Sequence, residues 1–146
     1  MSNKEYDILI IEDNLTDLEL MVRTLKRNHL ANNLITFEDG EQALEYLLKS
    51  GNHFNRKSNV TPKVIFLDLK LPKVNGLEVL AQLKANDKTK KIPVVIVTSS
   101  NQDPDIKAAY ELGANSFVVK PVDYDEFQEK MNTLGLYWLM VNESDI

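Results

Sequence analysis

The chain has 146 residues, of which 43% are hydrophobic and 27% are charged, and its formal net charge is −5. This length suits one domain with a hydrophobic core, and the composition is that of an ordinary soluble globular protein. The acidic balance argues against nucleic acid as the main partner, and the absence of cysteine excludes disulfides and thiolate metal sites.

The N-terminal sequence resembles neither a signal peptide nor a membrane span. A short apolar run at 7–11 ends in Glu12 and Asp13, whereas a helix that crosses a membrane needs about 20 apolar residues. We therefore expect a cytoplasmic protein with no membrane contact.

Apolar runs and helical patterns alternate along the chain. The apolar runs are rich in Val, Ile and Phe and lack strict alternation, which indicates strands buried on both faces of a parallel sheet. The helical patterns carry apolar residues at spacings of three and four. In chain order, we expect a strand at 7–11, a helix at 15–28, a strand at 33–37, a helix at 41–49, a polar surface loop at 50–63, a strand at 64–69, a helix at 77–85, a strand at 94–98, a helix capped by Asp103 that runs to Leu112, a strand at 116–120 and a last helix capped by Asp123.

This alternation predicts the fold class. Strand followed by helix, five times over, is typical of an α/β fold with a parallel sheet and right-handed crossovers. We expect a doubly wound five-stranded parallel sheet in the order 2-1-3-4-5, which is the flavodoxin-like arrangement.

Polar residues mark the ends of four of these strands. Glu12 and Asp13 follow the first, Asp68 lies near the end of the third, Thr98 ends the fourth and Lys120 ends the fifth. Because parallel strands all point the same way, these residues converge on one edge of the sheet, where such folds bind ligands. In the expected order the first and third strands are neighbours, so the three carboxylates would lie together.

Three carboxylates in one pocket repel each other, and a hard divalent cation offsets that repulsion. Mg²⁺ suits such a site because it takes carboxylate oxygens, waters and the oxygens of a substrate phosphate. With Mg²⁺ bound, Asp68 becomes a nucleophile toward phosphorus and forms an aspartyl phosphate. Lys120 would add positive charge, and Thr98 would offer its hydroxyl to a phosphoryl oxygen.

Each of these residues also has an ordinary structural explanation. Glu12 and Asp13 could be first-turn acids of a helix. Lys120 could extend to solvent, and Thr98 could be a β-branched strand residue. Asp68 is harder to explain in this way, because carboxylates in apolar runs are rarely buried unpaired. The coincidence of all of them at one sheet edge favours phosphoryl transfer.

Five segments of the chain resemble the receiver domain of two-component response regulators. They are ILIIEDN, FEDGEQAL, VIFLDLKLPKVNGLEVL, IPVVIVTSS and AYELGANSFVVKPVD, and they occur in the family's order over nearly the whole chain. The resemblance implies that Asp68 accepts a phosphoryl group from a sensor histidine kinase or a phosphotransfer protein. The long connection before the third strand and the ending LGLYWLMVNE are similar to single-domain regulators that accompany phytochrome-type sensor kinases.

The resemblance also implies the metal ligands. Glu12 and Asp13 match the acidic pair that holds Mg²⁺, although many members have Asp at the first position. The backbone carbonyl of Lys70 matches a third protein ligand. Lys120 matches the family's lysine, and its peptide bond to Pro121 is cis in the family.

A switch pair is implied as well. Thr98 and Phe117 match a hydroxyl that moves toward the phosphoryl group and an aromatic ring that turns inward behind it. Phe117 stands where Tyr is commoner, so no phenol hydroxyl is offered to a partner. Lys70 and Ser100 occupy the positions, two residues after Asp68 and Thr98, that tune the phosphoryl lifetime in the family.

Three other protein classes share parts of this pattern. Haloacid-dehalogenase-type phosphatases place a second Asp two residues after the nucleophile, where this chain has Lys70, and their acidic metal pair comes last in the chain. A flavin carrier would need a Ser/Thr/Gly-rich phosphate loop after the first strand, where EDNLTD is acidic. A pseudo-receiver that only binds partners usually lacks an acid, Asp or Lys position, and all are present here; it remains the alternative.

The last helix carries an apolar stripe that passes through Gly135. The stripe consists of Phe127, Met131, Leu134, Trp138 and Val141, which follow one another at intervals of four, three, four and three residues. Because this spacing is unbroken, it predicts that the helix continues past the glycine. The segment LYWLMV is apolar on every side, and a single domain core cannot cover all of these side chains. We expect a two-fold symmetric homodimer, unless the tail folds back over its own domain. The expected interface consists of Phe127, Met131, Leu134, Tyr137, Trp138 and Val141.

The domain organisation follows from these assignments. We expect a single receiver domain over 1–146, with its core at 6–134 and a helical extension at 135–142, and no output domain. Output would then travel through a protein surface, to a downstream protein target or back along a phosphorelay. The protein would be a phosphoacceptor that catalyses only its own phosphorylation and slow dephosphorylation, not an enzyme in the usual sense.

Overall fold

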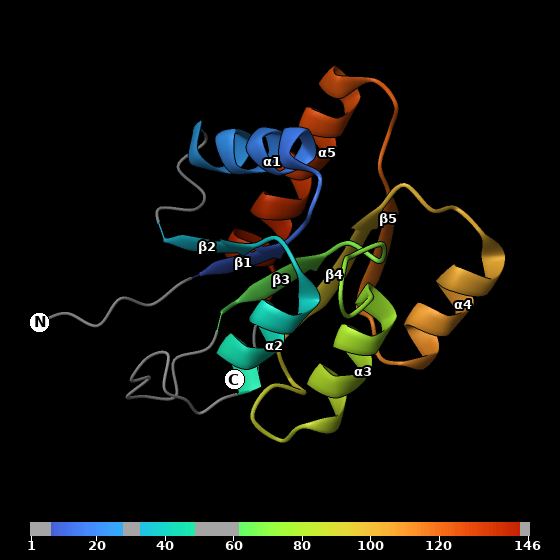
Figure 1. Cartoon of the computed structure of the whole chain (residues 1–146). Helices are drawn as coiled ribbons and strands as arrows, with labels where there is room; N and C mark the ends of the chain where they lie inside the picture. The colour runs from blue at the N-terminus through green and yellow to red at the C-terminus, as the bar shows by residue number, and fades with distance from the viewer. Residues whose placement is uncertain (1–6, 28–32, 49–61, 144–146) are drawn as a thin grey trace, which may run out of the picture.

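The structure is a computed structural model that describes residues 7–27, 33–48 and 62–143. Within these ranges, parallel strands form one five-stranded sheet with α-helices on both faces (Figure 1). The strand order is β2-β1-β3-β4-β5, which confirms the predicted doubly wound, flavodoxin-like fold. The predicted loop at 50–63 lies almost entirely outside the described residues.

Each predicted strand and helix is present. The strands are β1 (Ile8–Ile11), β2 (Leu34–Phe37), β3 (Val64–Leu67), β4 (Val94–Thr98) and β5 (Ser116–Val119). The helices are α1 (Leu15–Arg27), α2 (Gly40–Leu48), α3 (Gly76–Ala85), α4 (Asp103–Glu111) and α5 (Tyr124–Leu136). Two details differ from the prediction: β3 ends at Leu67, which leaves Asp68 in the loop, and Gln102 rather than Asp103 caps α4.

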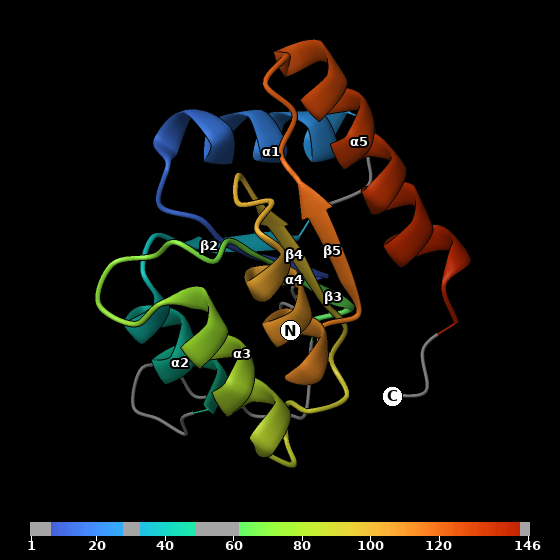
Figure 2. The ribbon, with the colours of Figure 1, turned by 90° about the vertical axis from the view of Figure 1, so that its right-hand side faces the viewer.

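The central strands divide the core into two layers because their side chains alternate between the two faces. β1 and β3 are fully buried along their length, as expected for strands covered on both sides. Helices α1 and α5 cover one face, and α2, α3 and α4 cover the other (Figures 1 and 2). This arrangement leaves the carboxyl ends of the strands, and the loops that follow them, as one edge of the molecule.

Helix α5 continues through Gly135, as predicted, and ends in a π-helical turn over Tyr137–Val141. Asp123 caps its start by accepting a hydrogen bond from the Asp125 amide at 3.0 Å. The prediction of the dimer interface is wrong for Phe127 and Met131, because their side chains are only 2% and 0% exposed. Both face their own domain, in the core layer that α1 and α5 share, because the stripe of α5 is needed to cover the sheet.

Leu134 and Trp138 continue the same stripe and are partly buried against this core layer. Leu139 packs against this layer as well, whereas other apolar side chains at this end of the helix are exposed: Leu136, Tyr137, Met140 and Val141. No helix in the described ranges has both the length and the apolar character to cross a membrane.

Candidate functional site at the carboxyl edge of the sheet

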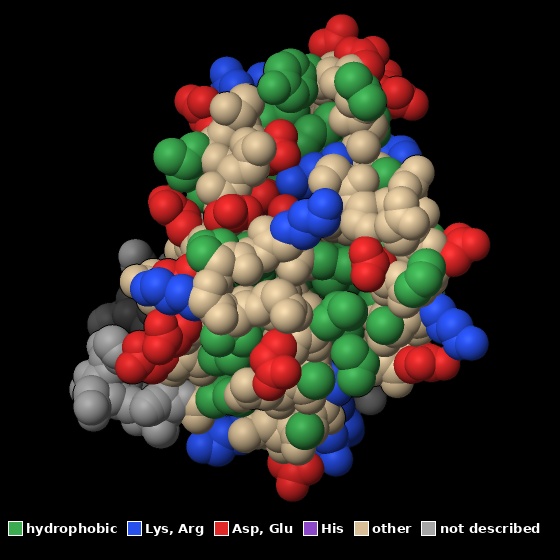
Figure 3. Space-filling model, turned by 45° about the vertical axis from the view of Figure 1, so that its right-hand side comes forward, with side chains coloured by type: hydrophobic (Ala, Val, Ile, Leu, Met, Phe, Trp, Pro, Cys, Tyr) green, Lys and Arg blue, Asp and Glu red, His purple; other side chains and the backbone are tan. Residues whose placement is uncertain are grey.

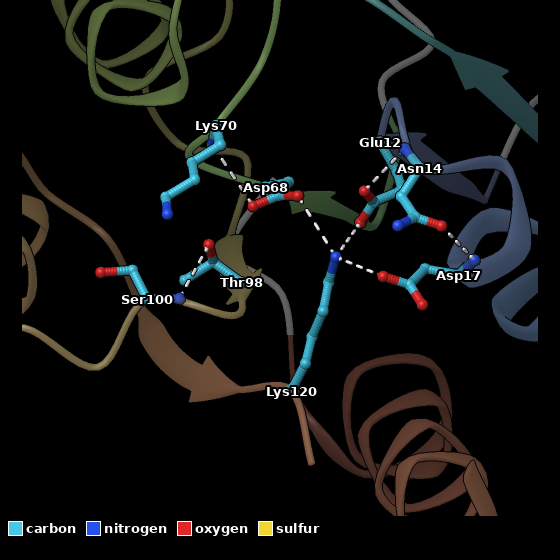
Figure 4. Close-up of polar contacts among 8 residues, drawn as sticks. All are labelled: Glu12, Asn14, Asp17, Asp68, Lys70, Thr98, Ser100 and Lys120. Carbon is cyan, nitrogen blue, oxygen red and sulfur yellow. Dashed lines mark hydrogen bonds and ion pairs between the residues drawn. The ribbon is translucent and has the colours of Figure 1, made fainter. Parts of the chain in front are cut away.

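The polar residues that follow the strands meet at one edge of the sheet. The register pairs Ile11 with Leu67 across β1 and β3, so the next residues, Glu12 and Asp68, are neighbours. The Asp68 amide donates a hydrogen bond to the Ile11 carbonyl at 3.0 Å, which fixes the start of the loop. In Figure 4 both carboxylates point toward the ammonium group of Lys120.

Glu12, Asp13 and Asp68 form an acidic group with the donor atoms of a metal site. Each offers one carboxylate oxygen, and these oxygens lie within 4.8 Å of one another. Glu12 and Asp68 are buried, whereas Asp13 is exposed. Burial and the charge of Asp68 raise the pKa of Glu12 from 4.5 to about 8, although Lys120 acts in the opposite direction. A second negative charge beside Asp68 is therefore unfavourable here without further positive charge, and the oxygen atoms of the group fit a hard cation such as Mg²⁺.

Lys120 extends from the end of β5 into this acidic group. Its Nζ lies 2.9 Å from a Glu12 oxygen, 2.7 Å from an Asp17 oxygen and 3.2 Å from an Asp68 oxygen. Burial alone would lower the pKa of Lys120, but the hydrogen bonds to Asp17 and Glu12 and the nearby charge of Asp68 raise it. Lys120 therefore stays protonated at the centre of the site.

Asp17 is a site residue that the sequence pattern did not reveal. It lies in the first turn of α1, where acids are common beside the positive end of the helix dipole. The connection from β1 to α1 is short, from Ile11 to Leu15, so this first turn stays beside the edge where β1 ends. This short connection is the feature of the sequence that could have indicated Asp17 as a site residue.

The loop after β3 packs tightly against the Asp68 backbone. The Lys70 amide donates to Asp68 Oδ1 at 3.4 Å, and the Gly76 amide donates to the Leu69 carbonyl at 2.8 Å. A Cβ atom on residue 76 would lie only 2.3 Å from the Asp68 carbonyl oxygen, so this position requires glycine. The loop keeps the Lys70 backbone beside Asp68, and metal binding by the Lys70 carbonyl stays a prediction.

Thr98 and Phe117, the predicted switch pair, lie on the neighbouring strands β4 and β5. Thr98 is fully buried, and its Oγ1 accepts a hydrogen bond from the Ser100 amide at 3.4 Å. The Ser100 hydroxyl donates to Asp105 in the first turn of α4, so this loop is tied to that helix. Phe117, in β5, is partly buried against the core layer of α2, α3 and α4. The movement of the pair stays a prediction.

The expected cis peptide bond between Lys120 and Pro121 is wrong. No peptide bond among the described residues is cis, so this bond is trans. The trans isomer of an X-Pro bond is favoured by about 0.5–1 kcal/mol. With this bond trans, the Lys120 amide still donates to the Thr98 carbonyl at 2.7 Å, which holds Lys120 at the end of β4.

Known proteins share this architecture over nearly the whole chain. The response regulator receiver domain family matches residues 8–132. The response regulator Rcp1 of Synechocystis is 36% identical over 138 residues, which cover 94% of this chain and 92% of Rcp1. The probable methanogenesis regulatory protein FilR2 of Methanothrix harundinacea is also 36% identical over 138 residues, 94% of this chain and 86% of FilR2.

Solved structures agree with these relatives. The phosphorylated cyanobacterial phytochrome response regulator RcpA superposes with a TM-score of 0.89 at 30% identity, covering 97% of this chain and 99% of RcpA. The Mn²⁺-bound form of Rcp1 superposes with a TM-score of 0.87 at 33% identity, covering 95% of this chain and 98% of Rcp1. The chain therefore belongs to the response regulator receiver family of two-component signal transduction.

Proposed function

We propose that this protein is a cytoplasmic response regulator that accepts a phosphoryl group on Asp68 from a sensor histidine kinase or a phosphotransfer protein. The observation that carries the proposal is the position of the Asp68 carboxylate. It is 6% exposed, belongs to the acidic group suited to a cation, and lies 3.2 Å from the ammonium of Lys120. Positive charge on both sides of a phosphoryl group is the main requirement of phosphoryl transfer.

In the transfer step, one Asp68 carboxylate oxygen donates an electron pair to the phosphorus of a phosphohistidine. The new O–P bond forms while the N–P bond breaks, and the electron pair of the N–P bond stays on the imidazole nitrogen. Lys120, already 3.2 Å from Asp68, exchanges this contact for a phosphoryl oxygen. The Thr98 hydroxyl, at the end of the neighbouring strand, donates to another phosphoryl oxygen.

Glu12, Asp13 and Asp68, with the Lys70 carbonyl, would hold a Mg²⁺ ion. Such an ion supplies positive charge beside the transferred group. The clustering of the three carboxylates supports this assignment. The similarity to Rcp1, a relative whose structure contains Mn²⁺, supports it independently.

The phosphodonor is a protein rather than only a small molecule. Exposed apolar side chains lie close in sequence to the site residues Asp17 and Lys120: Leu15 at the start of α1 is 62% exposed, and Val122 before α5 and Tyr124 at its start are 99% and 57% exposed. Acidic side chains gather nearby at the start of α5 (Figure 3). An apolar rim of this kind suits docking of another protein. The similarity to RcpA favours a kinase of the phytochrome type.

Output follows through protein contacts and not through nucleic acid. Phosphate on Asp68 would draw Thr98 inward and let Phe117 fill the space behind it. This change alters the surface formed by α4, β5 and α5, which a downstream protein target reads. A pseudo-receiver is the less favoured alternative, because Glu12, Asp13, Asp68 and Lys120 are all present at the site.

A homodimer on the C-terminal part of α5 completes the proposal. Because Phe127 and Met131 belong to the domain core, the interface would be smaller than the sequence suggested. It would be centred on the exposed Tyr137, Met140 and Val141, with Trp138 and Leu134 at its border. The Tyr137 and Trp138 rings pack edge to face with their centroids 5.0 Å apart.

The decisive experiment is to incubate the wild type and Asp68→Asn with Mg²⁺ and acetyl phosphate or an autophosphorylated kinase, and to map the acyl phosphate. We expect label on Asp68 alone in the wild type and no label in the variant. Asn keeps the shape of the side chain, so the variant should fold like the wild type. Circular dichroism of both proteins is the control. Label that persists in Asp68→Asn contradicts the assignment.

A further inference from the structure

We propose that Asp17 is a positioning residue that holds the Lys120 ammonium in place and so sets the rate at which Asp68 is phosphorylated. The inference rests on the proposed function, in which Asp68 is the phosphoacceptor. It concerns a carboxylate outside the acidic group that fits a cation.

The geometry of Lys120 gives Asp17 a special position. A lysine ammonium has three N–H donors, and three carboxylates surround this one: Glu12, Asp17 and Asp68 (Figure 4). The contact with Asp17 is the shortest of the three at 2.7 Å, and the side chains of Lys120 and Asp17 are 9% and 16% exposed. A short, largely buried ion pair of this kind is stronger than an ion pair between exposed side chains, which solvent screens.

Asp17 is itself held firmly. Its amide donates to Asn14 Oδ1 at 3.0 Å, and the Asn14 amide donates to Glu12 Oε2 at 3.1 Å. The helix that carries it is anchored by Leu18 and Met21, which are buried in the core. The Asp17 carboxylate is therefore presented by a rigid element, and Lys120, on a flexible stem, adapts to it.

The two acids that share Lys120 with Asp17 have a second task. Glu12 and Asp68 belong to the group that would bind a cation, and Asp17 does not. Asp17 is therefore the partner that Lys120 keeps when the other two carboxylates turn to a metal ion or a phosphoryl group. Lys120 already contacts Glu12 at 2.9 Å and Asp68 at 3.2 Å, and Asp17 competes with both for the ammonium, so that their oxygens are released more easily to a metal ion and to phosphorus.

Removal of this anchor should slow phosphorylation. In Asp17→Asn the shape and one acceptor oxygen remain, but the charge is lost, and Lys120 shifts from the position that Asp17 sets and pairs more strongly with Glu12 and Asp68. Because small displacements at a reacting centre are costly, we expect the initial rate with acetyl phosphate to fall on the order of tenfold. Asp17→Glu restores the charge and should recover most of the rate.

A double-mutant cycle tests whether Asp17 acts through Lys120. Asp17→Asn is made in the wild type and in Lys120→Met, with Glu19→Gln as a control that removes the same charge from an exposed position on α1. The inference predicts slower phosphorylation in the wild-type background and no further slowing in Lys120→Met. Equal slowing in both backgrounds, or a rate in Asp17→Asn that matches Glu19→Gln, overturns it.

A second measurement does not depend on phosphorylation. The ¹H–¹⁵N signal of the Lys120 ammonium reports whether the group is fixed and protected from exchange. We expect it in the wild type and in Asp17→Glu, and expect it to broaden or vanish in Asp17→Asn; an unchanged signal overturns the inference. Failure of the proposed function would look different, because Asp68 of the wild type would then accept no phosphate.

Discussion

At the scale of single residues, the charge of the Asp68 site is unbalanced. One ammonium faces several carboxylates, and the pKa of Glu12 is raised to about 8 as a result of burial and the charge of Asp68. A raised pKa means that Glu12 takes up a proton near neutral pH when no cation is bound, whereas a bound cation would favour its ionised form. The imbalance is the physical reason to expect a metal in the working form of the site.

Asp13 offers the cleanest test of that expectation, since its side chain is exposed and its removal leaves the core intact. Asp13→Ala should reduce Mg²⁺-dependent phosphorylation of Asp68. Mutation of a residue that only hydrogen-bonds a metal ligand lowers metal affinity or activity about 10–100-fold. Loss of a ligand itself should therefore lower the phosphorylation rate about 100-fold or more. Phosphorylation rates across a Mg²⁺ titration, with chelator as the reference, measure the effect. A rate in the variant that equals the wild-type rate would reject the metal role, provided that thermal unfolding is unchanged.

At the scale of elements, the β3–α3 loop is the most constrained segment around the site. Lys73 has a φ of 66°, a left-handed conformation that is unfavourable for a residue with a side chain. The Val74 amide donates back to the Pro72 carbonyl at 2.7 Å, which closes a tight turn. The turn also lies against α2, because a Cβ on Gly40 would meet the Val74 carbonyl oxygen at 2.3 Å. The backbone at Asp68 is therefore held by packing against both the turn and the start of α3.

Gly76→Ala should disrupt this loop severely. The new methyl group would collide with the Asp68 carbonyl oxygen and the Leu69 Cα, both of them backbone atoms that have no room to move. We expect the free energy of unfolding to fall by about 3 kcal/mol or more, and any folded protein to be phosphorylated poorly. Chemical denaturation measures the first effect.

The neighbouring variant Asn75→Ala is the matched control. It removes only the N-cap of α3, where Asn75 Oδ1 accepts from the Glu78 amide at 3.0 Å, and should cost about 1 kcal/mol. Equal losses of stability in the two variants would contradict the tight packing of Gly76 on Asp68.

At the scale of the whole molecule, the proposed switch links Asp68 to a distant surface. Thr98 is fully buried and its loop is tied to α4 through Ser100 and Asp105, so movement of Thr98 would be transmitted to that helix. Thr98→Ala should still accept phosphate but lose the change in partner affinity, which in allosteric proteins is typically about 5–150-fold. The measurement is the affinity of a partner for the phosphorylated and the unphosphorylated protein, made with the wild type and with Thr98→Ala. Normal signalling by Thr98→Ala would contradict the coupling.

Self-association is the second property of the whole molecule that can be measured. Met140 and Tyr137 are 70% and 45% exposed on the last turns of the C-terminal helix. If these side chains are buried between two copies, Met140→Glu and Tyr137→Glu should weaken the dimer by at least about tenfold. Val122→Glu, which changes an apolar residue that is 99% exposed elsewhere, should not. Sedimentation velocity distinguishes these outcomes, and a wild type that stays monomeric with and without phosphate would rule the dimer out.

The strands and the central site residues were predictable from sequence because they depend on local pattern. The residues of β1 and β3 are apolar without alternation, and burial on both faces of a parallel sheet is the physical cause of that pattern. Asp68 and Lys120 were found because each follows such a strand, and parallel strands bring their carboxyl ends together. The same reasoning predicts that Glu12 lies beside Asp68, and the register of β1 and β3 places the two residues side by side.

Sequence by itself therefore determined the fold class, the strand order and the group of residues around Asp68, since all of these follow from periodicity and strand direction. Tertiary structure decided the partner of Lys120 on α1 and the surface that covers α5. Asp17 and Lys120 are 103 residues apart, and no local pattern indicates their contact. The apolar stripe of α5 likewise identified a buried face but not what covers it, and the domain's own sheet, rather than a second copy, covers Phe127 and Met131. Periodicity reports that a face is removed from water, whereas the identity of its partner depends on packing between segments that are distant in the chain.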